Sequence, residues 1–403
     1  MKAKSIKGKS SEEIQSALEQ CMADARPDDP RLNESVGQAG GRGFKPTLAI
    51  VFISIKQDRK AVCEILHKEG IDVIGATSAG EFTDDQQSEG GIAILLLDIS
   101  RNNYIILFED IGQRRLEDVT ASLAQKALEK FRKPALILCS TLFSKAGTIT
   151  DGDTLVRNIE SAFGSDITMF GGMAGDDITF TGTFVFTHEK ETDNGLAVLV
   201  LDEEKISLHG VAISGWKPMG VVRTVTKSEG NLVYTIDDHP ALEIYMRFLG
   251  KDVATAEDQV RFFDSITVHY PFLIEREGLE PKICGPVGYD KEKKALICES
   301  NLIQGSRFRF STPPDFEIID SVINKAQEMK TATHAEADAL LIFSCAGRLS
   351  TLGPMAQQEN EGLADVWKVP MAGFYTYGEF GKGVNGKHEF HSTTNSWVAL
   401  EEK

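Results

Sequence analysis

Uninterrupted apolar runs recur along this chain and alternate with segments of helical periodicity. Residues 48–54, 135–140 and 339–344 contain no charged position, which is typical of β-strands that are covered on both faces. Apolar residues at helical spacing in 58–69 and 153–163 predict amphipathic helices after the first two runs. The pattern therefore predicts an α/β fold in which helices flank buried strands.

The same order of elements occurs three times: helix, strand, helix, strand, a turn in which a glycine precedes an acid, and a further strand. Residues 75–82 and 373–380 share one frame, in which a glycine, four further residues, a second glycine, an acid and a phenylalanine follow one another. Residues 170–177 are a looser copy, with Gly175 and Asp176 at the glycine and acid positions. Three matches in one internal order indicate three copies of one structural unit.

Residues 206–310 depart from this order. Apolar and polar residues alternate more in 221–226 and 232–236, which favours antiparallel strands, and Pro240 and Gly250 delimit a short helix. We therefore expect an α/β (α+β) chain with three related helix-strand-helix-strand-turn-strand units. These units form mixed sheets flanked by helices, with a strand-rich insertion in the C-terminal half.

The first residues carry weaker signals. Ser10 and Glu13 have the spacing of a capping box at the start of a helix, and residues 27–46, rich in Gly, Pro, Asp and Asn, predict a long loop. The basic residues at 1–10 are not followed by an apolar segment, so a secretory signal is not expected.

The composition is typical of a globular protein, and the net charge argues against two classes of partner. Of the 403 residues, 41% are apolar and 26% are charged, and the formal net charge of −17 argues against a nucleic-acid or anionic-membrane surface. No apolar run approaches the roughly 18 residues of a membrane span. The six cysteines are scattered without a Cys-x-x-Cys pair, so we expect neither a zinc site nor a disulfide framework, and a cytoplasmic location.

The repeats place hydroxyls and acids at comparable points. Ser54, Ser140 and Ser344 align at the carboxyl ends of the apolar strands, where open α/β sheets bind ligands. Each turn follows the next strand of its unit. The acids of the turns therefore reach the same region if that strand runs parallel to the apolar strand before it. Alternatively, the serines cap helices and the glycines make tight turns at positive φ, which leaves the acids unexplained. The candidate ligand-binding set is Ser54, Gly80, Glu81, Ser140, Gly172, Gly175, Asp176, Ser344, Arg348, Tyr375, Gly378 and Glu379.

Two members of this set have open alternatives. Arg348 either clamps a ligand carboxylate or pairs with Glu379 or Glu359 as part of the structure. Tyr375, with Tyr377, either lines an apolar pocket or belongs to a sheet face.

The sequence satisfies none of the enzyme templates that we compared with it. Ala76 stands where a nucleophile elbow needs glycine, and no phosphate-binding or dinucleotide-binding loop has the required spacing. His388 and His391 are spaced as neighbours but do not predict a metal pair. His239 or His269 could serve as a haem ligand, although surface or capping roles are favoured. We therefore expect no catalytic set, with an enzyme that uses strand-end carboxylates and hydroxyls as an alternative.

Several spaced motifs together resemble the FIST family (F-box and intracellular signal transduction proteins). They are GATSAGE at 75–81, GGMAGD at 171–176, IDDHPALEIY at 236–245, FSCAGR at 343–348 and GFYTYGE at 373–379. The resemblance covers almost the whole chain. It implies an N-terminal FIST domain over 1–205 and a C-terminal FIST domain over 206–403.

The resemblance implies a sensory module of prokaryotic signalling that binds small ligands, with amino acids or related metabolites as the expected class. Some members of the family are haem-based nitric-oxide sensors that act on a histidine kinase, which is the alternative reading, and no haem ligand can be assigned to a residue here. The chain reaches Lys403 without a kinase, cyclase or chemoreceptor segment, so we expect its output to pass through a separate partner. We expect neither nucleic acid nor membrane as a partner.

Overall fold

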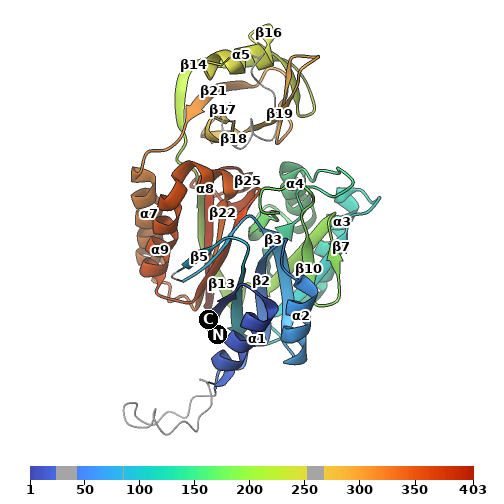
Figure 1. Ribbon diagram of the computed structural model, residues 1–403, viewed down its shortest axis with the longest axis vertical. Helices are drawn as coiled ribbons and strands as arrows, with labels where there is room; N and C mark the ends of the chain where they lie inside the picture. The colour runs from blue at the N-terminus through green and yellow to red at the C-terminus, as the bar shows by residue number, and fades with distance from the viewer. Residues whose placement is uncertain (24–42, 85, 252–266) are drawn as a thin grey trace.

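Three mixed β-sheets enclose one core, and a strand-rich insertion lies on top of them (Figure 1). This computed structural model describes residues 1–23, 43–84, 86–251 and 267–403. It confirms the expected α/β (α+β) class and the three related units. Most of the loop expected at 27–46 lies outside the described residues.

Each unit contains a first strand, a helix, a second strand, a further helical segment, a third strand, a short hairpin and a last strand. The first unit comprises β1 (Lys2–Gly8), α1 (Ser11–Ala23), β2 (Leu48–Ser54), α2 (Arg59–Lys68), β3 (Asp72–Ser78), β4 (Glu81–Thr83), β5 (Gln86–Ser88) and β6 (Ile92–Asp98). The second comprises β7 (Tyr104–Asp110), α3 (Leu116–Lys130), β8 (Pro134–Ser140), α4 (Gly152–Phe163), β9 (Thr168–Met173), β10 (Val185–Thr187), β11 (Glu191–Thr192) and β12 (Gly195–Asp202). The third comprises β13 (Ile206–Ile213), α7 (Glu317–Thr333), β22 (Ala339–Cys345), α8 (Ala346–Leu352), α9 (Ala356–Trp367), β23 (Met371–Thr376), β24 (Glu379–Lys382), β25 (His388–His391) and β26 (Asn395–Glu402).

Two first strands correct the expectation from sequence. The sequence pattern misses β1 and wrongly places β13 in the insertion. In the structure these are the first strands of the first and third units. β1 and β13 each pair antiparallel with the last strand of their own unit, β6 and β26. Their side chains are only partly buried, so neither strand forms a continuous apolar run.

Each unit lends its hairpin to the sheet of another unit. The hairpin β4–β5 of the first unit extends the third sheet beside β23, β10–β11 of the second unit extends the first sheet beside β3, and β24–β25 of the third unit extends the second sheet beside β9. The remaining strands keep the same order in all three sheets: first, last, second and third strand of the unit. The exchange is therefore cyclic.

A glycine and a phenylalanine face each other at each exchange. The register pairs Phe186 with Gly75, Phe82 with Gly373 and Phe380 with Gly171. A Cβ on Gly75 or Gly373 would lie 2.3 or 2.2 Å from a carbon of the opposing ring. Packing between units thus explains Gly75 and Gly373, because a ring of another unit covers each of them, whereas a Cβ on Gly171 would meet the backbone of Leu138.

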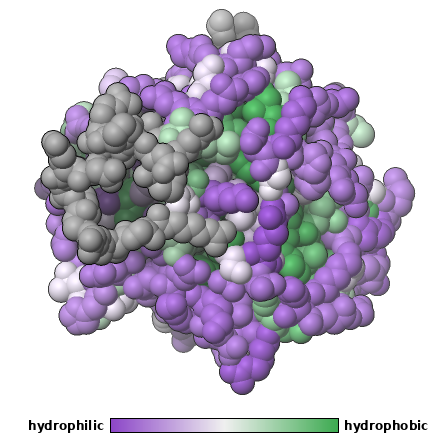
Figure 2. All heavy atoms as spheres, turned by 90° about the horizontal axis from the view of Figure 1, so that it is seen from below, coloured by the Kyte–Doolittle hydropathy of each residue, from purple (hydrophilic) through white to green (hydrophobic). Residues whose placement is uncertain are grey.

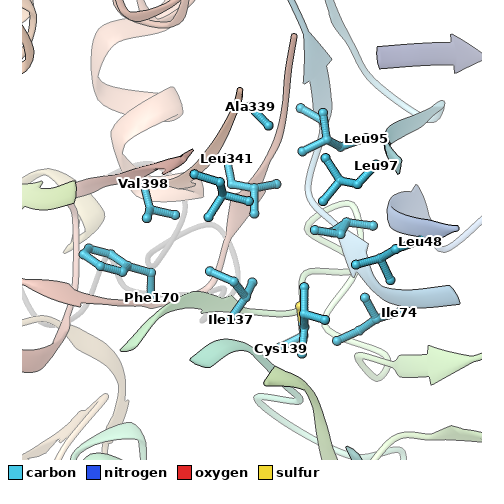
Figure 3. Packing of buried hydrophobic residues seen from close by; sticks show 14 of the residues in the cluster. Leu48, Ile74, Leu95, Leu97, Ile137, Cys139, Phe170, Ala339, Leu341 and Val398 are labelled. Atoms are coloured by element: carbon cyan, nitrogen blue, oxygen red, sulfur yellow. The ribbon is translucent and has the colours of Figure 1, made fainter. Parts of the chain in front are cut away.

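The core lies where the three sheets face one another (Figure 3). Leu48 and Leu97 of the first sheet point toward Ile137 and Cys139 of the second and Leu341 of the third. The helices of each unit cover the outer face of its sheet, and further apolar clusters form there. The central strands β2, β8 and β22 are therefore buried along their whole length, which explains their unbroken apolar sequence.

The insertion occupies residues 214–316, between β13 and α7, and has its own aromatic core around Tyr245, Phe272 and Phe308. It contains β14 (Lys217–Glu229), β15 (Leu232–Ile236), β16 (His239–Pro240), α5 (Ala241–Phe248), β17 (Phe272–Arg276), β18 (Leu279–Cys284), β19 (Pro286–Asp290), β20 (Ala295–Cys298) and β21 (Arg307–Thr312), together with a 3-10 turn at Thr267–His269. Its strands pair antiparallel, as their alternating sequence predicts. The three units together are called the body below.

The face of the body opposite the insertion is mainly hydrophilic. Figure 2 shows charged and polar side chains over the described part of this face, with hydrophobic residues in narrow furrows between them. Within the described ranges, none of the helices combines the length and the apolarity needed to cross a membrane.

Candidate functional site

The three turns between the third strand and the hairpin meet at the carboxyl ends of the central strands. They meet there because β2 and β3, β8 and β9, and β22 and β23 are parallel pairs. Backbone hydrogen bonds join the turns directly, from Ala79 N to Tyr375 O (2.9 Å), from Gly175 N to Thr77 O (2.8 Å) and from Met173 N to Gly378 O (2.8 Å). Backbone therefore fills the point at which the turns meet.

The glycines of the candidate set serve this close approach. Gly80 and Gly378 have φ values of 121° and 154°, a region that favours glycine. A Cβ on Gly175 would lie 2.6 Å from a backbone nitrogen, and one on Gly172 would lie 2.5 Å from the side chain of Thr376. The tight-turn explanation of Gly80 and Gly378 is confirmed.

Glu81 and Glu379 occupy equivalent buried positions in the first and third units. Each carboxylate accepts a hydrogen bond from a hydroxyl three residues earlier and further bonds from groups near the unit's last strand. For Glu81 the donors are Ser78 Oγ, Ser88 Oγ (3.2 Å) and Gly91 N (2.9 Å); for Glu379 they are Thr376 Oγ1, Thr394 Oγ1 (2.6 Å) and Thr394 N (3.2 Å). The two acids thus tie the turns to the sheets.

Burial changes the protonation of both acids. It raises the pKa of Glu81 to about 7 and that of Glu379 to about 8, although the hydrogen bonds from their hydroxyl and backbone donors oppose the shift. Both carboxyl groups therefore exchange protons near neutral pH.

Asp176 of the second unit has a different task, because its carboxylate holds the loop that follows it. It accepts hydrogen bonds from the N–H groups of Phe180 (3.1 Å) and Thr181 (2.6 Å), and from the hydroxyl of Tyr377 (2.6 Å). Tyr377 also accepts a bond from the N–H of Ile178 at 2.9 Å. A turn of the third unit therefore fixes a loop of the second.

This loop stores backbone strain. Asp177, Ile178 and Phe180 have positive φ values of 54°, 59° and 52°, which cost free energy for residues other than glycine. Strained backbone of this kind persists where its surroundings hold it, and it clusters at ligand sites. Ile178 and Phe180 are also the loop residues that line the cavity described below.

The three serines have unlike surroundings. Ser54 donates a hydrogen bond of 2.6 Å to Asp177 Oδ2, Ser140 Oγ is buried without a partner among the described residues, and the carbonyl of Ser344 accepts a bond from Thr376. The side chains of Asp58 and Asp151 cap the first two helices that follow these strands, and the N-cap residue of α8 is Cys345, which makes no side-chain cap hydrogen bond. The prediction that the serines cap helices is therefore wrong.

Arg348 is enclosed and paired with Glu359. Its Nε donates to Glu359 Oε2 at 2.9 Å, Nη2 donates to the other carboxylate oxygen, and Asn395 adds a bond of 2.7 Å to the same acid. Of the two readings left open by the sequence, the structural ion pair with Glu359 is present. Tyr375 is also buried, with its hydroxyl 2.8 Å from Gln87 Oε1.

A cavity of about 360 Å³ lies beside the turns, between the body and the insertion. Its lower wall follows the carboxyl ends of β8, β22 and β23, and includes Phe143, Gly347 and Tyr377. Its upper wall comes from the insertion and includes Val287 and Glu299. Mainly apolar walls with a few convergent polar groups are the usual form of a small-molecule site.

None of the twelve candidate residues is among those that line this cavity. Several are adjacent in sequence, because Thr376 and Tyr377 lie between Tyr375 and Gly378, and Cys345 follows Ser344. The structure thus places only part of the predicted set, Ser344, Arg348, Tyr375 and Gly378, next in sequence to residues that line the cavity. Their direct contact with a ligand stays a prediction.

Glu299 is the charged residue among the described lining residues, and sequence reasoning missed it. It is partly exposed at the end of β20, and its carboxylate accepts hydrogen bonds from Gly285 N (2.7 Å) and from Ser392 Oγ of the body (2.9 Å). Burial raises its pKa to about 7. No repeat marks this glutamate, because the insertion occurs once in the chain.

Ion pairs connect the insertion to the body around the cavity. Arg276 of β17 forms a two-pronged pair with Glu389 of β25, and Lys282 of β18 pairs with Asp153 of α4. The insertion therefore rests on the body through polar contacts that surround an apolar space.

The two histidines considered as haem ligands do not line this cavity. Neither His239 nor His269 is among the residues that line it, and the described lining contains no other histidine. The Nδ1 atom of His269 is hydrogen-bonded to Thr351 at 2.8 Å, and the exposed His239 lines a separate hollow within the insertion. The described residues also contain no group of three or more His, Cys, Asp or Glu that could hold a metal ion.

Two family models match successive parts of this chain. Residues 47–239 match the family model of the FIST N domain, and residues 241–382 match that of the FIST C domain. An uncharacterised protein of Methanocaldococcus jannaschii is 23% identical over 351 residues, which span 81% of this chain and 66% of the relative.

Proposed function

This chain belongs to the FIST family, whose domains are associated with sensing in signal transduction, and on that premise we propose that it binds a small, mainly apolar ligand between insertion and body. Ligand binding would change the contact between the two parts, and a separate signalling partner in the cytoplasm would read the change. Amino acids and related metabolites are the first compounds to test.

The observation that carries this proposal is that the two walls of the cavity come from different parts of the protein, the body and the insertion. Phe143 and Tyr377 come from the body, whereas Val287 and Glu299 come from the insertion. A ligand that contacts both walls binds one relative placement of the two parts better than another, and this difference in affinity is what shifts a conformational equilibrium. The strained loop at 177–180 adds a wall that is held in place by Tyr377.

A thermal-shift screen of metabolites tests the proposal. A ligand present at 100 times its dissociation constant stabilises the folded protein by about 2.7 kcal/mol, so a true ligand raises the melting temperature by several degrees. The variant Val287→Trp should abolish the shift, because the indole fills the cavity. Val221→Trp is the matched control, since Val221 is 67% exposed on β14 of the same insertion and does not line the cavity.

The signalling step has its own readout. Hydrogen exchange at β17, β18 and α8 should slow when a ligand binds, because these elements adjoin the cavity or form the contact between the two parts. A ligand that stabilises Val287→Trp as well as the wild type would show that it binds elsewhere and would contradict the proposal.

A further inference from the structure

We propose that the cavity selects ligands with a cationic ammonium group, and that the carboxylate of Glu299 binds this group. The inference rests on the proposed function, because it names the ligand class for the same cavity. The inference requires a cationic ligand. A neutral ligand in the cavity would agree with the proposed function but not with this inference.

The first argument for this inference is the formal charge of the residues that line the cavity. Glu299 is the one residue with a formally charged side chain among the described residues that line the cavity. The other polar groups there are hydroxyls, thiols, an amide and backbone, as at Thr376, Cys345 and Asn231. A ligand carboxylate would therefore lose its hydration without gaining a cation, whereas a ligand ammonium would meet an anion.

The second argument is the geometry of Glu299. Each of its carboxylate oxygens accepts one hydrogen bond, Oε1 from Gly285 N at 2.7 Å and Oε2 from Ser392 Oγ at 2.9 Å. A carboxylate offers about four acceptor positions, so capacity remains for a donor inside the cavity. Lys282 and Asp153, two charged residues whose charges act on Glu299 in opposite directions, are paired with each other. Hydrogen bonds from the insertion and from the body thus hold the Glu299 carboxylate in place. It can still accept a further hydrogen bond from a ligand.

The walls define the rest of the ligand. The rings of Phe143, Phe180 and Tyr377 lie nearly parallel, with centroids 5.7–6.1 Å apart, and Phe390 and Leu142 continue this apolar surface. Such walls suit an aromatic or aliphatic group, and ring faces also attract a nearby cation. Together with Glu299 they favour a small primary amine with an apolar body over a zwitterionic amino acid.

Three probes of one shape test this selectivity: phenethylamine, 2-phenylethanol and free phenylalanine, measured by calorimetric titration of the full chain. The wild type should bind the amine about tenfold or more tightly than the alcohol and the amino acid, because a hydrogen-bonded charge pair is the added contact. Glu299→Gln should reduce the affinity for the amine to that for the alcohol and leave the alcohol unchanged.

Glu389→Gln is the matched control. It removes a carboxylate that joins insertion and body through Arg276 but does not line the cavity, so the preference for the amine should remain. Equal binding of amine and alcohol by the wild type overturns the inference, as does a preference that survives Glu299→Gln, or the binding of none of the three probes. If neutral compounds bind and Val287→Trp blocks them, the proposed function stands while the ammonium assignment falls.

Discussion

The hydroxyl of Tyr377 donates a hydrogen bond of 2.6 Å to Asp176 Oδ1, joining the glycine-acid turn of the second unit to that of the third. The same oxygen of Tyr377 accepts a bond from Ile178 N. One phenol therefore holds a strained loop on which a wall of the cavity depends.

Tyr377→Phe should loosen this loop. The change removes both hydrogen bonds and leaves a buried carboxylate and a backbone N–H with fewer partners, at a cost of about 1–3 kcal/mol. Urea unfolding measures the free energy of unfolding, and hydrogen exchange at 176–182 should accelerate. Tyr234→Phe is the control, because its hydroxyl bonds to Glu229 at the surface and should cost little. Unchanged exchange in the loop would contradict the assigned role.

Breaking the Arg348–Glu359 pair should destabilise the protein strongly. Arg348→Leu leaves Glu359 as a buried charge without its cation, which typically costs 3–5 kcal/mol, roughly as much as Glu359→Leu. The double variant should cost less than the sum, because no uncompensated charge remains. Urea unfolding of all four proteins gives the coupling energy. If Arg348→Leu or Glu359→Leu is as stable as the wild type, the pair does not stabilise the fold. That result would favour the alternative in which Arg348 binds a ligand carboxylate.

The buried acids predict a decrease in stability as the pH rises. The raised pKa values of Glu81 and Glu379, about 7 and about 8, mean that the folded protein binds more protons than the unfolded chain above about pH 4.5. The free energy of unfolding should therefore fall from pH 5 to pH 8.5, by at most about 1.4 kcal/mol per pH unit for each group.

Two glutamine variants check this origin. Glu81→Gln and Glu379→Gln should each flatten the dependence of the unfolding free energy on pH. Glu109→Gln should not flatten it, because Glu109 pairs with Lys126 and Arg114 and its pKa is lowered. A slope that is the same in all variants would refute the assignment.

Gly75→Ala should cost about 1–3 kcal/mol by overpacking, because the new methyl group would meet the ring of Phe186. Phe186→Ala combined with Gly75→Ala should cost less than the two single changes together, with a coupling on the order of 1 kcal/mol. Gly383→Ala is the control, since its nearest neighbour would be a side-chain atom 3.1 Å away. Additive costs would contradict direct contact between the units.

Local patterns were sufficient for most strands and helices. Residues 48–54 match β2 at both ends and 153–163 match α4 to within one residue, and the buried parallel strands are recognisable because both faces are apolar. The exchanged hairpins were not predictable in this way. Glu81–Thr83 is only three residues long and pairs with Ala372–Phe374, which lie nearly 300 positions away. Such pairing leaves no periodic signal.

The sequence placed the candidate residues at the end of the strands where the cavity lies, but none of them lines the cavity itself. The acids Glu81, Asp176 and Glu379 are marked by repetition, and repetition marked the residues that build the turns. The cavity depends on where the insertion rests, which Arg276, Lys282 and Glu299 determine through contacts with distant residues. Those contacts are properties of the folded chain.

The cyclic exchange of hairpins gives the body the organisation of a domain-swapped trimer whose subunits are joined in one chain. Each unit completes one neighbour and is completed by the other, as in a ring closed by heterologous contacts. The boundary between the two family models, near residue 240, thus separates strands that share sheets. A single unit could complete its sheet only by borrowing a hairpin from another unit. The insertion interrupts just one of the units, so a scaffold of three similar units carries the cavity described above at one place, beneath the insertion.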